Sequence, residues 1–118
     1  MKKITLVEDD NAIREFLVIF LESEDYAVSS YATVGEFSRR DMMYIPDLYL
    51  FDVMLPDGSG IDLCKNIKDS RENSAVPVII MSAHAQLIQL KSQCDPDDFI
   101  AKPFDIDIML NKIRNQIL

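Results

Sequence analysis

Cysteine is scarce in this sequence, and its placing excludes several classes of protein. Cys64 and Cys94 are the only two cysteines, and neither belongs to a CxxC pair or to a cluster with histidine. A disulfide-rich secreted domain and a zinc site are therefore excluded, and both thiols are expected to be reduced. The longest apolar run, residues 16–21, is too short to cross a bilayer, and no apolar signal core follows Met1. We expect a cytoplasmic protein without a membrane partner.

Positive charge is also scarce. The chain has 12 lysines and arginines against 20 aspartates and glutamates, which gives a formal net charge of −8. A surface this acidic repels phosphate backbones, so direct binding of DNA or RNA by this chain is excluded. An acidic surface is compatible with cation binding. The positions of the carboxylates therefore matter more than their number.

The length leaves no room for a second unit. A chain of 118 residues of which 48% are hydrophobic has the size and composition of one globular domain. We expect a single domain over residues 1–118. Any output module would then lie on another chain or on a part of the gene product outside this sequence.

Short apolar runs alternate with amphipathic stretches along the whole chain. The runs predict strands at Ile4–Val7, Ala27–Tyr31, Leu48–Phe51, Val76–Met81 and Phe99–Ala101. The amphipathic stretches predict helices at Ala12–Glu24, Val34–Arg40, Ile61–Asp69, Ala85–Ser92 and Ile106–Leu118. Strict alternation of strand and helix indicates a doubly wound α/β domain, with a parallel sheet covered by helices on both faces.

Capping residues support these helices. Thr33 and Glu36 have the spacing of a capping box at the start of the second helix. Asp105 is placed to cap the last helix, and either Asp10 or Asn11 to cap the first. The starts of these helices are therefore better defined by the sequence than their ends.

Polar side chains gather where the predicted strands end. Glu8 and Asp9 follow the first strand, Asp52 the third, Ser82 the fourth and Lys102 the fifth. Ligands of open α/β sheets bind at the carboxyl ends of the strands, so these groups are expected to converge. Facing carboxylates repel one another, and Mg²⁺ relieves this because it takes carboxylate oxygens as ligands.

One aspartate at this edge can then act as a nucleophile toward phosphorus and form an aspartyl phosphate. The ammonium of Lys102 and the hydroxyl of Ser82 would stabilise the other phosphoryl oxygens. Taken singly, each residue also has an ordinary structural explanation, such as a helix cap or a turn. Their joint occurrence at strand ends favours a functional site.

Several motifs together resemble the receiver domain of two-component response regulators. The sequence stretches concerned are "LVEDDNAIRE", "PDLYLFDVMLPDGSGIDLC", "PVIIMSA" and "DDFIAKPF". They occur in the family's order and cover essentially the whole chain. The resemblance implies a flavodoxin-like sheet of five parallel strands in the order 2-1-3-4-5.

The resemblance also implies roles for individual residues. Asp52 would accept a phosphoryl group from a sensor histidine kinase or phosphotransfer protein. Asp9 and Asp52 would bind Mg²⁺ directly, Glu8 mainly through water, and Met54 through its backbone carbonyl. Lys102, joined to Pro103 by a cis peptide bond, would pair with the phosphoryl oxygens. Ser82 and Phe99 would form the switch, in which the Ser82 hydroxyl moves toward the phosphoryl group.

The family role implied is a switch rather than a dedicated enzyme, with activity limited to its own phosphotransfer and dephosphorylation. Phosphorylation of Asp52 would change the signalling face and so control a downstream effector or an appended output domain.

Some features depart from the family's usual pattern. The segment from Ser82 to Lys102 is slightly shorter, and "CDPDDF" replaces the usual Gly-Ala pair before the acidic residues. We therefore expect a short or remodelled fourth helix. Ile108 stands where many members have an acidic residue that forms ion pairs in a dimer, which leaves a homodimer open. His84 lies close to the phosphorylation site and is a candidate to affect water access there.

Other functions fit the sequence less well. A phosphatase of the haloacid dehalogenase type needs its nucleophilic aspartate after the first strand and a second aspartate two residues on, and residues 8–11 do not provide that pair. A module that acts without phosphorylation would not need all of the pocket residues. A flavin domain would need a phosphate-binding loop after the first strand, and none is present.

Overall fold

The computed structural model describes residues 1–83 and 94–117. Its elements are, in chain order, β1 Lys2–Val7, α1 Asn11–Ser23, β2 Tyr26–Tyr31, α2 Val34–Ser38, β3 Leu48–Asp52, β4 Met54–Leu55, β5 Gly58–Ser59, α3 Gly60–Asp69, β6 Val78–Ala83, β7 Asp98–Lys102 and α5 Ile106–Gln116. The helix predicted at Ala85–Ser92 and the role suggested for His84 lie outside the described residues.

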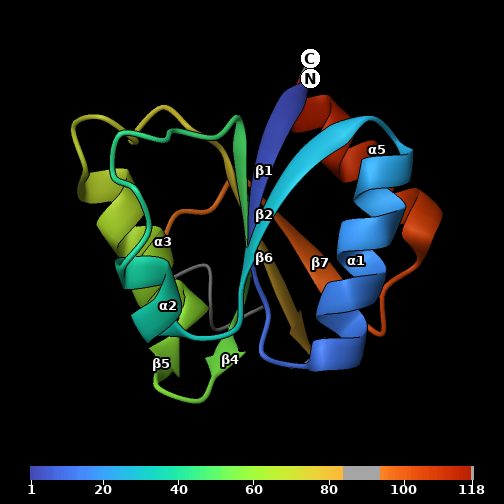
Figure 1. Ribbon diagram of the computed structural model, residues 1–118, viewed down its shortest axis with the longest axis horizontal. Coiled ribbons are helices and arrows are strands. Elements are labelled where there is room, and N and C mark those ends of the chain that lie inside the picture. Colours follow the sequence, from blue (N-terminus) through green and yellow to red (C-terminus); the bar gives the residue numbers. More distant parts are fainter. Residues whose placement is uncertain (84–93, 118) are drawn as a thin grey trace.

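The main sheet has five parallel strands in the order β2-β1-β3-β6-β7. Counted along the chain without the small β4–β5 hairpin, this is the predicted order 2-1-3-4-5. Helices α1 and α5 cover one face of the sheet, and α2 and α3 cover the other (Figure 1). The prediction of a doubly wound, flavodoxin-like fold is confirmed.

The central strand β3 is buried on both faces, as its continuous apolar sequence predicts. Leu48 and Leu50 belong to the core cluster on the α1–α5 face, whereas Tyr49 and Phe51 belong to the cluster on the α2–α3 face. Phe37 of α2 packs edge-on against Phe51, with ring centroids 5.4 Å apart. Burial of each of these side chains stabilises the fold by roughly 1.5–3 kcal/mol. The two layers therefore hold β3 rigidly.

The predicted helix starts are confirmed closely. Asp10 caps α1 by accepting a hydrogen bond from the Ile13 N–H, and Asp105 caps α5. The Thr33 hydroxyl oxygen accepts from the Glu36 N–H at 3.0 Å, which is the threonine half of the predicted capping box. The helix ends are less accurate, since α2 ends at Ser38 and α5 at Gln116.

The fourth predicted strand is displaced along the chain. It was expected at Val76–Met81, and β6 covers Val78–Ala83. Pro77 has no N–H to donate, and the first strand residue with a donor is Val78, whose N–H goes to Asp97. Ser82 consequently lies inside β6 rather than after it. Asp52 and Lys102 are the last residues of β3 and β7.

The described helices include none with the length and apolar character needed to cross a membrane.

Candidate functional site

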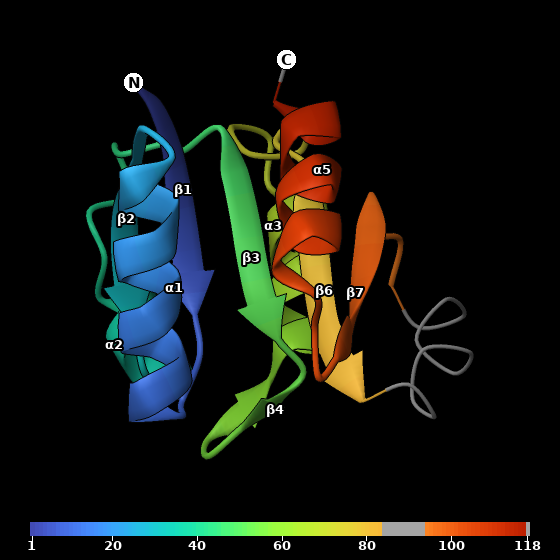
Figure 2. The ribbon, with the colours of Figure 1, turned by 90° about the vertical axis from the view of Figure 1, so that its right-hand side faces the viewer.

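The carboxyl ends of β1, β3 and β6 meet at one edge of the sheet, with the β4–β5 hairpin beside them (Figure 2). Glu8 follows β1, Asp52 ends β3 and Lys102 ends β7. The two chain termini lie at the opposite end of the molecule (Figures 1 and 2). The strand ends therefore bring together residues that are more than forty positions apart in the sequence.

Lys102 joins the two buried carboxylates of this edge. Its Nζ donates to Glu8 Oε2 at 2.9 Å and lies 3.2 Å from Asp52 Oδ1. The side chains of Glu8 and Asp52 are 1% and 7% exposed, whereas that of Lys102 is 23% exposed. Asp9 is exposed, and oxygens of Glu8, Asp9 and Asp52 lie within 4.8 Å of one another. The prediction that Glu8, Asp9, Asp52 and Lys102 lie close together is confirmed.

The backbone fixes the acidic residues at this edge. The Glu8 N–H donates to the Tyr31 carbonyl of β2 at 3.0 Å, and the Glu8 carbonyl accepts from the Arg14 guanidinium at 2.9 Å. Glu8 Oε1 also accepts from the Asp10 N–H. Just after Asp52, the Val53 N–H donates to the Met81 carbonyl of β6 at 3.1 Å. The backbone at Glu8 and the backbone just after Asp52 are therefore held by neighbouring strands and by Arg14, and the Glu8 carboxylate is also held by the Asp10 N–H.

Burial raises the pKa of both carboxyl groups. Removal from water is the main cause for Asp52 and for Glu8, and the Lys102 ammonium opposes it. Burial disfavours charge on Lys102 as well, but the two carboxylates outweigh it and raise the pKa of the ammonium. The site thus holds charge that the surrounding protein does not fully stabilise.

The donor set fits a hard divalent cation. Three carboxylates against one ammonium leave two negative charges (1 − 3 = −2) within a few ångströms. All of the donors are oxygens, which Mg²⁺ prefers, and Asp9 keeps one side open to water. Because Glu8 is committed to Lys102 and to the Asp10 N–H, its oxygens are less available than those of Asp9 and Asp52.

Ser82 and Met54 lie near these carboxylates in the fold. Ser82 is buried in β6, one residue after Met81, which pairs with Asp52. Its hydroxyl donates to the Ala83 carbonyl at 3.2 Å. Met54 starts β4, two residues after Asp52, and its side chain is exposed, so any role at the site falls to its backbone. The roles given to these residues by the family resemblance stay predictions.

The peptide bond between Lys102 and Pro103 is cis, as the resemblance implies. Phe99 lies on β7 three residues before Lys102 and packs against the core cluster of the α2–α3 face.

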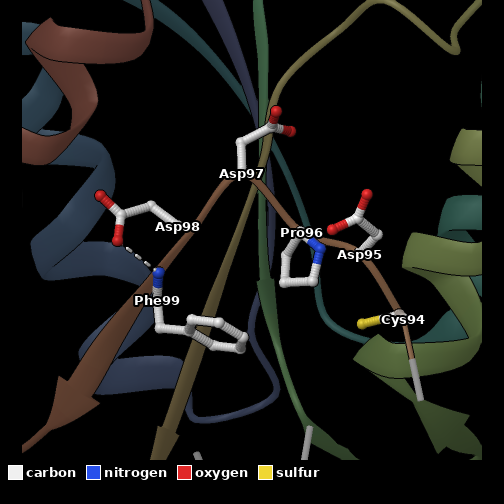
Figure 3. A pocket seen from close by; sticks show the side chains of 6 residues that line it. All are labelled: Cys94, Asp95, Pro96, Asp97, Asp98 and Phe99. Atoms are coloured by element: carbon white, nitrogen blue, oxygen red, sulfur yellow. Dashed lines mark hydrogen bonds between the residues drawn. The ribbon is translucent and has the colours of Figure 1, made fainter. Parts of the chain in front are cut away.

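A pocket of about 410 Å³ adjoins Phe99, and its lining includes none of Glu8, Asp9, Asp52 and Lys102. It is lined by residues 94–99, and the ring of Phe99 and the thiol of Cys94 both point toward its middle (Figure 3). It lies beside the amino end of β7, whereas Lys102 is at the carboxyl end of that strand. This pocket is therefore not the site of the predicted chemistry.

Two acidic residues of the unusual "CDPDDF" segment, Asp97 and Asp98, have structural partners. Asp97 accepts from the Val78 N–H at 2.8 Å and from Lys68 of α3 at 2.6 Å. Asp98 accepts from Lys112 of α5 at 3.2 Å. These contacts attach the start of β7 to its neighbours on both faces of the sheet.

The loop after Asp52 makes a close backbone contact that the sequence does not predict. A Cβ on Gly60 would lie 2.1 Å from the Asp52 carbonyl oxygen, so only glycine fits there. The Gly60 N–H donates to the Val53 carbonyl at 3.0 Å. The two glycines of "DGSG" stand at the turn into α3. Gly60 does more, because it lets the loop fold back directly on the strand that ends in Asp52.

Comparison with known proteins agrees with the geometry. A model of the response regulator receiver domain matches residues 4–114. The transcriptional regulatory protein CseB of Streptomyces coelicolor is 39% identical over 116 residues, which cover 94% of this chain and 47% of that protein. The KDP operon transcriptional regulatory protein KdpE of Escherichia coli is 36% identical and covers 97% of this chain and 50% of its own length.

The solved structure of the non-phosphorylated HemR receiver domain from Leptospira biflexa has the same fold. It superposes with a TM-score of 0.86 at 30% identity, and covers 99% of this chain and 94% of that one. The chain belongs to the response regulator receiver domain family, whose members signal through phosphorylation. The resemblance seen in the sequence motifs is thus confirmed. The chain spans about half the length of the curated relatives named above.

Proposed function

We propose that Asp52 is the phosphoacceptor of this receiver domain. Burial is the observation that carries the proposal, because the Asp52 carboxylate is 7% exposed yet lies 3.2 Å from the Lys102 ammonium. Asp9 and Glu8 supply further carboxylate oxygens within 4.8 Å. A buried, rigidly held carboxylate beside a cation and an open acidic edge suits nucleophilic attack on phosphorus better than a purely structural role.

In this proposal, Asp9, Asp52 and the Met54 carbonyl would hold Mg²⁺ directly, and Glu8 would act mainly through water. The bound ion would neutralise the carboxylates and a phosphoryl oxygen. This assignment is supported by the all-oxygen donor set and by the residual charge of −2, from three carboxylates and one ammonium.

In the proposed step, an Asp52 carboxylate oxygen attacks the phosphorus of a phosphohistidine on the partner kinase. The P–N bond breaks, the imidazole recovers a proton from solvent, and an acyl phosphate forms on Asp52. Lys102, which bridges Glu8 and Asp52, is near enough to turn toward the phosphoryl oxygens. The Ser82 hydroxyl would also turn toward the phosphoryl oxygens. The Phe99 ring, as the switch aromatic, would then change its packing.

The partners follow from the family and from the size of the chain. The phosphoryl donor is a sensor histidine kinase or a phosphotransfer protein, and a downstream effector or an appended output domain responds. CseB and KdpE are transcriptional regulators about twice as long as this chain, which supports an appended domain. The net charge of −8 argues against nucleic-acid binding by residues 1–118 themselves.

Residues 1–118 would therefore act as one cytoplasmic receiver domain, able to form a homodimer in principle. Its catalysis is confined to its own phosphotransfer and dephosphorylation, so it is a switch rather than an enzyme acting on other substrates.

The test is intact-mass analysis after incubation with acetyl phosphate and Mg²⁺. We expect one phosphoryl adduct on the wild-type chain, no adduct on Asp52→Asn, and none when the metal is chelated. Asp62→Asn is the matched control, because it removes an exposed aspartate of α3 and should leave the adduct unchanged. An adduct that persists in Asp52→Asn would contradict the assignment. No adduct under any condition would favour an interaction module that acts without phosphorylation.

A further inference from the structure

A contact between the hairpin tip and α2 lies beside the proposed site but is not explained by it. Strands β4 and β5 pair antiparallel, Met54 with Ser59 and Leu55 with Gly58, so Pro56 and Asp57 form the tip. The Asp57 carboxylate accepts from the Val34 N–H at 2.8 Å and from the Gly35 N–H at 2.9 Å. Both donors belong to the first turn of α2, whereas Asp57 is more than twenty residues further along the chain.

The carboxylate of Asp57 supplements the local cap of α2. The first N–H groups of a helix have no partner within the helix. Thr33 satisfies the N–H of Glu36, and Asp57 satisfies the two before it. The hydrogen bonds from Gly35 and Val34 lower the pKa of Asp57, so it carries its charge at neutral pH. This part of α2 is therefore bound by the hairpin tip rather than by solvent.

The hairpin tip is in close contact with the start of α2. A Cβ on Gly58 would lie 2.9 Å from Val34 Cγ2, and one on Gly35 would lie 3.3 Å from Asp57 Oδ2. The hairpin backbone at Gly58 thus closely approaches the Val34 side chain, and the Asp57 side chain closely approaches the α2 backbone at Gly35. In Figure 1 the hairpin lies directly beneath α2, in agreement with these contacts.

The same hairpin starts at the proposed metal site. Gly60 packs against the Asp52 carbonyl at its base, and the Leu55 side chain is buried in the α2–α3 core cluster. Met54, which is expected to offer its carbonyl to Mg²⁺, lies between the base and the tip. The hairpin has two paired positions on each strand and is closed at its base by the bond from the Gly60 N–H to the Val53 carbonyl, and so short a ribbon is not stable by itself. Its anchors must set where the Met54 carbonyl lies.

We propose that Asp57 is a positioning residue for the Mg²⁺ site: by binding the start of α2, it fixes the hairpin that presents the Met54 carbonyl. This inference rests on the proposed function. It assigns no contact between Asp57 and the metal or the phosphoryl group. It also implies that a change at the start of α2 alters Mg²⁺ binding, and that Mg²⁺ binding alters the start of α2.

The experiment compares Mg²⁺ affinity with amide exchange in the full chain. Asp57→Ala removes both hydrogen bonds, and Asp57→Asn replaces one acceptor oxygen by an amide that cannot accept. We expect the Kd for Mg²⁺, measured by calorimetry, to rise about threefold to tenfold in Asp57→Ala and less in Asp57→Asn. Direct outer-shell partners of metal ligands cost about 10–100-fold, so this more remote group should cost less. Hydrogen exchange of the Val34 and Gly35 amides should quicken in the same order.

Two control variants separate positioning from other effects. Thr33→Ala weakens the cap of α2 without touching the hairpin, and should leave the Mg²⁺ affinity unchanged. Asp62→Asn removes the same charge from an exposed site on α3, and should also leave it unchanged. Gly58→Ala, which forces Val34 away, should instead lower the affinity as the Asp57 variants do.

Three results would overturn the inference. Equal Mg²⁺ affinity in the wild type and in both Asp57 variants would refute the positioning role and leave the proposed function intact. A loss in Thr33→Ala as large as in Asp57→Ala would show that α2 stability alone matters. A wild-type chain that binds no Mg²⁺ would instead refute the proposed function, and the positioning role with it.

Discussion

Two groups of lysine–carboxylate pairs lie at the two ends of β7, and they differ in burial rather than in distance. At the carboxyl end, Lys102 contacts Glu8 and Asp52 at 2.9 and 3.2 Å. At the amino end, Lys68 contacts Asp97 at 2.6 Å and Lys112 contacts Asp98 at 3.2 Å. The side chains of the second group are all between 24% and 34% exposed, whereas Glu8 is 1% exposed.

Burial decides what each group can do. At the amino end, water screens the charges and the pairs mainly fix the start of β7. At the carboxyl end, burial raises the pKa of Glu8 and Asp52, and the three carboxylates outnumber the single ammonium. A partly unsatisfied, buried charge cluster is costly for stability, and a bound cation relieves that cost. The comparison therefore separates the pairs that fix the start of β7 from the buried cluster to which we assign the proposed function.

Removal of Lys102 should have the largest effect on stability. In Lys102→Met the two buried carboxylates lose their shared counter-ion, so the free energy of unfolding should fall by about 3 kcal/mol in the metal-free protein at pH 7. Mg²⁺ should restore part of the loss because it takes over the neutralising role. Urea unfolding with and without Mg²⁺ measures both effects. A loss no greater than that in Lys112→Met would break the distinction between the two groups.

Replacement of Asp52 should have a smaller effect of opposite sign. Burial raises the pKa of Asp52 in the folded state, so its charged form destabilises the fold at neutral pH. Asp52→Asn should therefore raise the free energy of unfolding of the metal-free protein by about 1 kcal/mol.

The pH dependence of this gain has a definite sign. As the pH falls from 8 toward the ordinary aspartate value of about 4, the folded wild type takes up a proton at Asp52 before the unfolded chain does. The wild type then gains stability and its difference from Asp52→Asn shrinks. Urea unfolding of both proteins in chelator across this range measures the difference. A gap that widens toward acid pH would contradict the account.

The exposed pairs should contribute least. Lys68→Met and Lys112→Met each remove one partner of an ion pair whose side chains are 24–34% exposed. Each should lower the free energy of unfolding by no more than about 1 kcal/mol. The loss should become smaller at high salt, which screens exposed charges. Thermal unfolding at low and high salt tests this. A salt-independent loss in either variant would mean that the pair is more deeply shielded than its exposure indicates.

The sequence predicted most of the sheet because its strands are continuous apolar runs. β3 was expected at Leu48–Phe51 and occurs at Leu48–Asp52, since both of its faces are buried. The convergence of Glu8, Asp52 and Lys102 could also be predicted, because parallel strands end at one edge of a sheet.

The β4–β5 hairpin could not be predicted in the same way. Strands of two residues have no periodicity to recognise, and the partners of Asp57 are in a distant helix turn. A glycine in such a loop is typical of a turn, but the contact of Gly60 with the Asp52 carbonyl depends on tertiary packing. The position of Ser82 inside β6 depended on the pairing of Val78 with Tyr49, which the sequence alone did not determine.

The most direct test of the central claim is a Mg²⁺ titration followed by amide chemical shifts. The account predicts saturable shifts at Glu8, Asp9, Asp52 and Met54, no comparable shifts at the exposed pairs of β7, and loss of the response in Asp52→Asn. Equal shifts around Asp97 and Asp98, or no saturable shifts at the carboxyl end of the sheet, would contradict it.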